Sequence, residues 1–273
     1  MSSYVISGVA RGIGYEFLSQ LSADPNNTVF GLVRDKAVAD KKITTNFPDR
    51  KNIHIIQADV TDYEAVKNAA DYVSTTTGGS IDYIIANAGI VSLKAALAGF
   101  GELSQDHQWL EQDISTTFRT NVIGPINLFN LFVPLLLEGK TKKAIAISSG
   151  MADTDMVTTH DIYHSGPYAI SKAALNMAVA KFSAEYRKQG ALFMSICPGW
   201  VKTEMGNDSA QTELEKQSFV ELFTKFQEYE PSFQGPITPE ESVKAVLSVL
   251  YNSSVEGGQA GAYLSHHGNK RWL

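Results

Sequence analysis

The chain has 273 residues, of which 44% are hydrophobic and 19% charged, a composition typical of one folded α/β domain and not of a disordered chain. Lys and Arg number 23 against 29 Asp and Glu, so the net charge of -6 provides no basic surface for a nucleic-acid partner. The one cysteine, Cys197, excludes a disulfide framework or a thiolate metal cage within one chain, and we expect a buried, unreactive thiol.

The N-terminal residues and the most apolar stretch bear on localisation. Residues Tyr4–Ser7 already have the pattern of a strand, which leaves no room before them for a secretory signal. The stretch 128–137 is about half the ~20 residues that a membrane span needs, and it contains Asn130 and Pro134. We therefore expect a cytoplasmic protein with no membrane partner.

Short apolar runs rich in β-formers alternate along the chain with segments of helical spacing. The runs are Tyr4–Ser7, Thr28–Val33, Ile53–Gln57, Tyr83–Ala86, Ala144–Ser148 and Leu192–Ile196. Runs that are apolar on both faces indicate a parallel sheet covered by helices on each side. We predict an α/β fold with a doubly wound parallel sheet. Because no linker, repeat or low-complexity tract marks a boundary, we predict one domain over 1–273.

Two of the predicted helices carry clear start signals. Asp62 precedes a run of apolar positions at helical spacing, and that helix is expected to end before Gly78. Thr238 precedes Pro239, and Glu241 lies three residues after the threonine. This is the pattern of a capping box with proline at the first helical position.

A glycine-rich turn follows the first predicted strand and leads into a helix. Its glycines, Gly8, Gly12 and Gly14, have the spacing G-x-x-x-G-x-G and not the general dinucleotide spacing G-x-G-x-x-G. Backbone N–H groups at a helix N-terminus bind a pyrophosphate well when glycines allow close approach. A tight strand-to-helix turn also needs glycine for steric reasons, so both interpretations stay open at this point.

An arginine ends the second strand, close to where NAD-binding proteins carry an acidic residue for the ribose 2′-hydroxyl. Arg34 is a permanently charged planar donor, and Arg11 in the glycine turn can reach the same side. The pair favours a 2′-phosphate, and therefore NADP(H) over NAD(H). The alternative is that Arg34 begins a solvated loop and pairs with Asp35.

Tyr168 and Lys172 are four residues apart in a segment of strong helix formers, so both are expected on one helix face. A nearby ammonium favours the phenolate, and we expect Lys172 to lower the pKa of Tyr168 from its usual value near ~10. Taken alone, such a pair on a surface helix is usually structural. Its interpretation therefore depends on the rest of the chain.

The chain resembles the classical short-chain dehydrogenase/reductase family over nearly its whole length. The matching segments are the glycine turn, Asp59-Val60, Asn87-Ala88-Gly89, Asn121, Ser148-Ser149, Tyr168-x-x-x-Lys172 and Pro198-Gly199-Trp200-Val201-Lys202-Thr203. Several of them are similar to carbonyl reductases of the sniffer and C-factor type and to fungal ketoreductases. The resemblance implies a Rossmann fold, and dimers, tetramers or monomers are all known in the family.

The family resemblance further implies an NADPH-dependent reductase of a ketone or aldehyde. Tyr168 would donate a proton to the carbonyl oxygen, Ser149 would hydrogen-bond it, and Lys172 would hold the nicotinamide ribose. Asn121 would connect the lysine to solvent through water, and Ser148 remains the alternative to Ser149. The implied cofactor-binding residues are Gly8, Arg11, Gly12, Ile13, Gly14, Arg34, Asp59, Val60, Asn87, Ala88, Gly89, Tyr168, Lys172, Pro198, Gly199, Val201 and Thr203. A catalytically idle NADP(H)-binding sensor or scaffold is the alternative function.

The chain departs from the family pattern after the catalytic serine. Ser149 and Tyr168 are farther apart than is usual in the family, and the extra residues 151–166 are expected to border the substrate. His160 and His164 lie four apart and could share a helix face as metal ligands, but no third ligand is nearby. We expect a surface loop there and no metal site.

A polar segment over 204–236 contains phenylalanines and a leucine at helical spacing. These residues are Phe219, Leu222, Phe223 and Phe226. The segment is expected to be a lid over an apolar or aromatic substrate, and the alternative is an ordinary amphipathic helix packed on the core. The His266-His267 pair is expected in an exposed tail.

Overall fold

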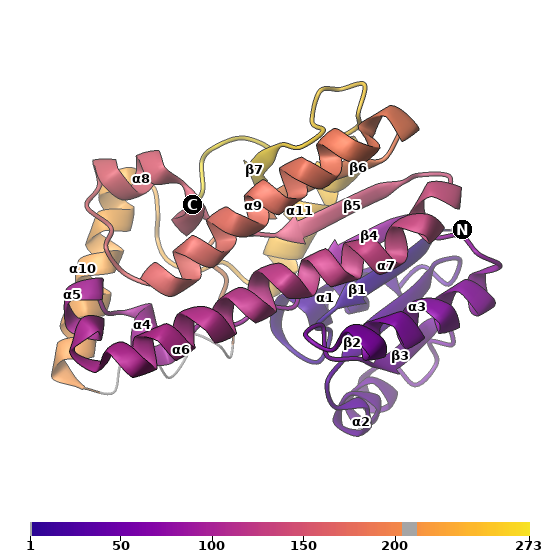
Figure 1. Ribbon diagram of the computed structural model, residues 1–273, viewed down its shortest axis with the longest axis horizontal. Helices are drawn as coiled ribbons and strands as arrows, with labels where there is room; N and C mark the ends of the chain where they lie inside the picture. Colours follow the sequence, from indigo (N-terminus) through magenta and orange to yellow (C-terminus); the bar gives the residue numbers. More distant parts are fainter. Residues whose placement is uncertain (1, 204–211) are drawn as a thin grey trace.

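The computed structural model describes residues 2–203 and 212–273 (Figure 1). Its described strands form one parallel sheet in the order β3-β2-β1-β4-β5-β6-β7. The strands are β1 (Ser3–Ser7), β2 (Thr28–Val33), β3 (Ile53–Gln57), β4 (Tyr83–Ala86), β5 (Lys143–Ile147), β6 (Leu192–Cys197) and β7 (Tyr263–Ser265). The six predicted strands agree with the structure to within one residue at each end, whereas β7 was not predicted.

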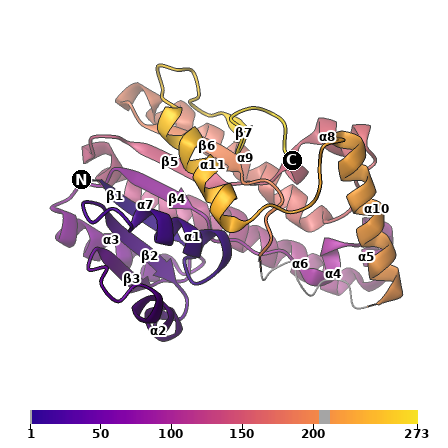
Figure 2. The same ribbon diagram turned by 180° about the vertical axis from the view of Figure 1, so that it is seen from behind.

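Helices cover both faces of the sheet. One face packs against α3 (Tyr63–Thr77), α7 (Gly124–Glu138) and α9 (Gly166–Tyr186). The other packs against α1 (Gly12–Leu21), α2 (Lys36–Asn46) and α11 (Pro239–Asn252), as Figure 2 shows from behind. The prediction of a doubly wound parallel sheet is therefore confirmed.

The predicted helix signals act as expected. The Asp62 side chain accepts a hydrogen bond from the Ala65 N–H (3.1 Å), and the helix α3 ends at Gly78, which has a φ of 71°. At the start of α11, Thr238 and Glu241 form the reciprocal bonds of a capping box. These helix ends could be predicted from the sequence because the capping residues satisfy backbone groups that a helix end leaves unpaired.

Short helices and the ends of longer ones gather beyond one end of the sheet (Figure 1). They are α4 (Leu93–Ala96), α5 (Phe100–Leu103), α6 (His107–Phe118), α8 (Thr154–Thr159) and α10 (Glu213–Tyr229). A π-helical turn at Arg119–Ile123 joins α6 to α7. The run Phe100–Glu138 is long and apolar enough to cross a membrane by length and composition, but its apolar window is 50% buried inside the fold. A buried core helix of this length is equally apolar.

Candidate functional site

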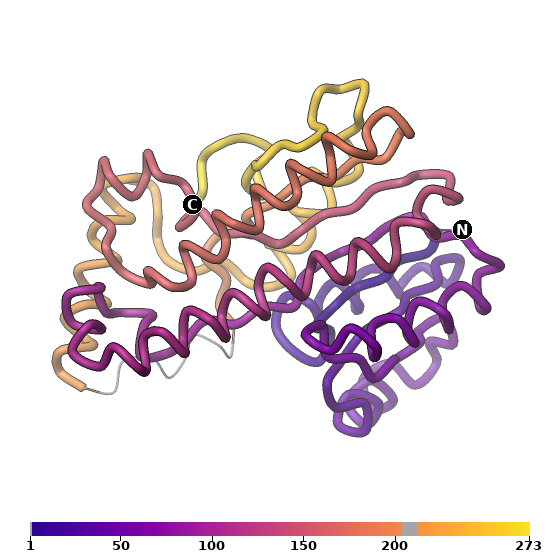
Figure 3. Tube along the Cα trace, viewed as in Figure 1, coloured from indigo at the N-terminus to yellow at the C-terminus, as the bar shows by residue number. Residues whose placement is uncertain are grey.

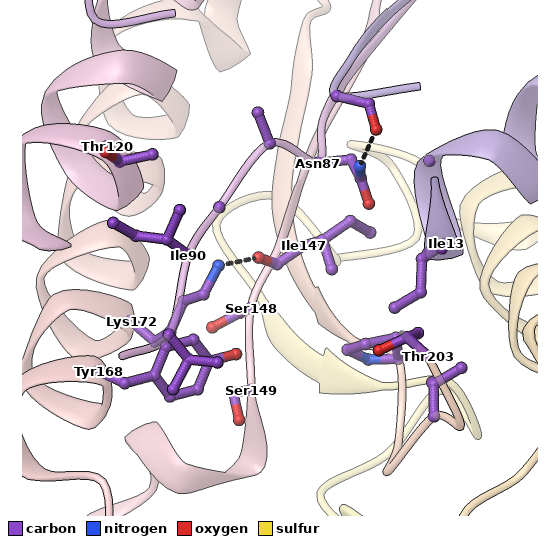
Figure 4. A pocket seen from close by; sticks show the side chains of 18 of the residues that line it. Ile13, Asn87, Ile90, Thr120, Ile147, Ser148, Ser149, Tyr168, Lys172 and Thr203 are labelled. Atoms are coloured by element: carbon purple, nitrogen blue, oxygen red, sulfur yellow. Dashed lines mark hydrogen bonds between the residues drawn. The ribbon is translucent and has the colours of Figure 1, made fainter. Parts of the chain in front are cut away.

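A cavity of about 930 Å³ lies where β1, β4 and β5 end, between the glycine turn, α9 and α10. All of the sequence-predicted catalytic and cofactor-binding residues line it except Asn121. Figure 4 shows Ser149, Tyr168 and Lys172 on one side of this space and Ile13 with Thr203 on the other. Ligands of doubly wound sheets bind at this edge, outside the carboxyl ends of the strands.

The glycine turn is shaped for the close approach of a ligand. A Cβ on Gly14 would lie 2.1 Å from the Gly8 carbonyl oxygen, and a Cβ on Gly8 would lie 2.9 Å from Ala88 Cα. Gly8 also has a φ of 79°, which disfavours any other residue. No side chain caps the N-terminus of α1. The turn therefore presents uncapped helix N–H groups to the cavity, a suitable site for a pyrophosphate.

The two arginines that were predicted to choose the cofactor line the same cavity. Asp35 caps α2 instead of pairing with Arg34, because its carboxylate accepts a hydrogen bond from the Val38 N–H at 3.0 Å. Within residues 2–203 and 212–273, the guanidinium groups of Arg11 and Arg34 have no hydrogen-bond or ion-pair partner. Both guanidinium groups therefore keep their donors for an anionic ligand.

The two adjacent serines have different surroundings. Ser148 Oγ donates to Asn176 Oδ1 at 2.7 Å, and the side chain is only 2% exposed. Ser149 Oγ accepts a longer bond from the Met151 N–H (3.3 Å) and interacts with the Tyr168 hydroxyl. The geometry thus favours Ser149 over Ser148 as the serine that contacts a ligand.

Tyr168 and Lys172 lie one turn apart on α9, and Lys172 Nζ donates to the Ile147 carbonyl at 2.8 Å (Figure 4). Burial raises the pKa of Tyr168 to about 12, although the Ser149 hydroxyl acts to lower it. Burial also lowers the pKa of Lys172 to about 8. The prediction that the ammonium lowers the phenol's pKa is therefore wrong here. Nζ lies 5.6 Å from the Tyr168 ring centroid, and desolvation dominates.

Replacing Lys172 with methionine is expected to stabilise the fold at pH 7. Because the lysine pKa falls from 10.5 to about 8 on folding, the unfolded chain binds more protons between these values, and the buried charge opposes folding below them. The shift corresponds to about 3 kcal/mol, of which the lost bond to Ile147 offsets ~1 kcal/mol. Urea unfolding should show a gain of about 2 kcal/mol at pH 7 that shrinks towards pH 9.5.

The matched control for this stability effect is Lys181→Met, on an exposed position of the same helix. It should change the free energy of unfolding by less than about 0.5 kcal/mol. A loss of stability in Lys172→Met at pH 7 would contradict the assigned cost of the buried ammonium.

Asn121 lies just behind the cavity, in the π-helical turn. Its amide is fully buried and bonds the N–H of Ile90 (2.8 Å), the carbonyl of Ile90 (2.9 Å) and Ser171 Oγ (3.0 Å). A Cβ on Gly89 would lie 3.2 Å from Asn121 Oδ1 and 3.4 Å from Lys172 Nζ. The asparagine therefore anchors the loop after β4 on one side of the lysine, and π-turns are frequent at such sites.

The residues between the serine and the tyrosine form α8, and Met151 and Met156 line the cavity as expected. The expectation of a surface position is wrong for His164, which is 1% exposed. Its ring stacks on Tyr163 (4.1 Å between centroids), whose hydroxyl donates to Glu221 of α10 at 2.7 Å, a neighbour that the sequence did not indicate. In the described part of the chain, no three His, Cys, Asp or Glu side chains are grouped to hold a metal.

The helix α10 packs as the amphipathic helix that was the alternative for the 204–236 segment, of which 204–211 lie outside the described residues. Phe219, Leu222 and Phe226 line the cavity. Phe223 does not, and packs on Trp200 and Phe233. The helix is thus both a packed amphipathic element and the apolar wall of the cavity.

The expectation of an exposed tail holds for His267 and is wrong for His266 and for the last two residues. His266 is 8% exposed and packs against Gly199, and the burial lowers its pKa to about 4. Trp272, which is 2% exposed, and Leu273 line the cavity. No periodicity in the sequence indicated that the C-terminal segment lies at the cavity, because β7 has only three residues. Cys197 is buried as predicted, and burial raises its pKa to about 11.

Comparisons with known proteins agree with this geometry. The family model described as short chain dehydrogenase matches residues 3–214. The short chain dehydrogenase virK of Hypocrea virens is 48% identical over 273 residues, 100% of each chain. The short-chain dehydrogenase/reductase iacC of Pestalotiopsis fici is 43% identical over 274 residues, again 100% of each chain.

Two solved structures share the architecture. The NADPH-bound carbonyl reductase from chicken fatty liver superposes with a TM-score of 0.75 at 28% identity, over 98% of each chain. The carbonyl reductase Sniffer of D. melanogaster superposes with a TM-score of 0.76 at 22% identity over 98% of each chain, which supports the fold alone. With its fold, its site and its full-length relatives, the chain belongs to the short-chain dehydrogenase/reductase family of nicotinamide-dependent oxidoreductases.

Proposed function

We propose that the protein uses NADPH to reduce an apolar or aromatic ketone or aldehyde to an alcohol. One observation carries the proposal. One cavity is lined by Arg11 and Arg34, whose guanidinium groups have no protein partner among the described residues, by Ser149 and Tyr168, and by apolar side chains of α10. We further propose that the chain acts as one NADP(H)-binding domain in the cytoplasm.

The glycine turn and the arginines fit the phosphates of NADP(H). The N–H groups at the start of α1 would hold the pyrophosphate, and Arg11 with Arg34 would hold the 2′-phosphate. Lys172 would hold the nicotinamide ribose from the opposite side of the cavity. When bound, NADPH supplies the hydride that reduces the carbonyl carbon.

Tyr168 donates the proton that completes the reduction. Burial raises its pKa to about 12, so the phenol is protonated at pH 7 and can give its proton to the carbonyl oxygen as the hydride arrives. The Ser149 hydroxyl donates its one proton in a hydrogen bond to that oxygen before the transfer. Once the product alcohol has formed, the same hydroxyl can turn to the phenolate left behind, since its interaction with Tyr168 lowers the phenol's pKa. A solvent proton then restores Tyr168.

A panel of carbonyl compounds tests the proposal. Purified protein should oxidise NADPH with aromatic ketones and quinones, and the decrease in absorbance of the reduced nicotinamide measures the rate. Tight NADPH binding without turnover of any carbonyl in the panel would contradict the proposal and favour a cofactor-binding sensor.

Phe219→Ala should weaken binding of a two-ring ketone such as 1-tetralone. The side chain is part of the apolar wall, and its removal is expected to raise KM about tenfold, because an aromatic contact with the substrate is lost. Turnover of propanal, which is too small to fill the space, should change by less than about twofold. Steady-state kinetics with both substrates measure the difference.

The matched control is Phe223→Ala. Phe219 and Phe223 are both half-buried, and their rings lie 5.7 Å and 6.2 Å from the Trp200 ring, but only Phe219 lines the cavity. Phe223→Ala should therefore lower stability without changing KM selectively. Equal effects of the two changes on the KM for 1-tetralone would argue against a substrate contact by Phe219.

A further inference from the structure

After β7 the chain runs back towards the middle of the molecule (Figure 3), and Trp272 and Leu273 line the cavity, with Trp272 packed on Gly150. Gly268, with a φ of 73°, makes the turn, and its N–H donates to the Ser265 carbonyl at 2.8 Å. The Trp272 N–H donates to the Tyr229 hydroxyl at 3.2 Å, and this hydroxyl donates to the Lys270 carbonyl at 3.1 Å. The segment is thus fixed to the end of α10.

The segment contacts the backbone that directly follows the Ser149 Cα. The Tyr263 hydroxyl donates a hydrogen bond to the Ser149 carbonyl. The Trp272 ring stacks on the Tyr263 ring, with 4.3 Å between centroids and 17° between planes. A Cβ on Gly150 would lie 2.5 Å from Trp272 Cβ, so the tryptophan also packs directly on the residue after the serine.

These contacts add to the local bonds of the turn, in which the Ser149 carbonyl accepts from the Ala152 N–H at 3.0 Å. Ser149 stands at the start of a 3-10 turn, and its hydroxyl accepts a 3.3 Å bond from the Met151 N–H and interacts with the Tyr168 hydroxyl. A general acid and its partners must be held within a fraction of an ångström of the reacting atoms. The hydrogen bond from Tyr263 and the packing of Trp272 supply such support from an element that carries no reacting group.

We propose that Tyr263 and Trp272 are positioning residues, which hold Ser149 so that its hydroxyl meets both the substrate carbonyl and Tyr168. This role rests on the proposed carbonyl reduction. It differs from direct contact with the substrate. A residue that positions Ser149 affects the turnover of every substrate, whereas a residue that lines the cavity affects the binding of large substrates.

Tyr263→Phe tests the role, because it removes the hydrogen bond to Ser149 and keeps the stacked ring. We expect kcat to fall about tenfold with both propanal and 1-tetralone, and KM and the NADPH Kd to change less than about twofold. Trp272→Ala should lower kcat by about 10²-fold, whereas Trp272→Phe, which keeps a stacked ring, should recover most of the activity.

A pH profile separates positioning from loss of structure. Alcohol oxidation needs the Tyr168 phenolate, so its rate rises with pH through the pKa of that phenol. Because the Ser149 hydroxyl acts to lower this pKa, a loosened serine should move the rising limb of the Tyr263→Phe profile to higher pH. A merely structural role would change the amount of folded protein and leave the profile in place.

Tyr251→Phe is the matched control, since the Tyr251 hydroxyl bonds Tyr4 (3.2 Å) at the other end of the sheet. It should keep both kcat and the pH profile. A wild-type protein that reduces no carbonyl overturns the proposed function and this role with it. An active wild type whose Tyr263→Phe variant keeps its kcat and profile overturns the positioning role alone, and a selective rise in KM for 1-tetralone does the same.

Discussion

Tyr168→Phe is expected to lower kcat for NADPH-dependent carbonyl reduction by about a thousandfold. Phenylalanine keeps the ring and its packing and removes only the hydroxyl that donates the proton. The donor is protonated at the outset, because burial raises the Tyr168 pKa to about 12. Rates of NADPH oxidation with a saturating aromatic ketone measure the loss.

The control for this loss is Tyr186→Phe, on the same helix but outside the cavity lining. It should keep full turnover. NADPH binding, followed by calorimetry, should be nearly equal in the wild type and Tyr168→Phe, since the hydroxyl is not expected to carry most of the cofactor's binding energy. Full turnover by Tyr168→Phe would show that another group donates the proton.

The fold was predictable where burial and local chemistry act together. The runs that became β2 and β4 are apolar on both faces, a pattern that a doubly covered parallel sheet requires, and their bounds match the structure. The three-residue strand β7 escaped prediction. Its pairing with β6 is set by long-range contacts, and its own residues carry no alternation long enough to recognise.

Some features of the candidate site could likewise be predicted from local sequence patterns, and others could not. Residues fixed by a turn or by helical spacing, such as Gly14 and the Tyr168–Lys172 pair, lie in the cavity as predicted. The ionisation of that pair was mispredicted, because spacing reveals a neighbour but not the desolvation that raises one pKa and lowers the other. The contact of Trp272 with Gly150 joins positions more than a hundred residues apart and has no local pattern.

Arg34→Asp is expected to reverse the cofactor preference from NADPH to NADH. Arg34 lines the cavity after β2, and Asp35 does not neutralise it because that carboxylate caps α2. The change removes a charge-assisted partner of the 2′-phosphate and places a carboxylate there, which repels the phosphate but accepts a hydrogen bond from a ribose hydroxyl. Calorimetry should show the NADPH Kd rising about 10²-fold and the NADH Kd falling.

Arg119→Asp distinguishes a direct contact of Arg34 with the 2′-phosphate from a long-range effect of positive charge in the cavity. Arg119 lines the same cavity and undergoes the same change of charge, but it lies by the Thr61 carbonyl, to which it donates at 3.4 Å. If Arg34 binds the 2′-phosphate directly, Arg119→Asp should weaken both cofactors by similar factors and leave their ratio unchanged. Should the two variants change the ratio equally, long-range charge would explain the preference. Equal use of both cofactors by the wild type would remove the basis for assigning the 2′-phosphate to Arg11 and Arg34.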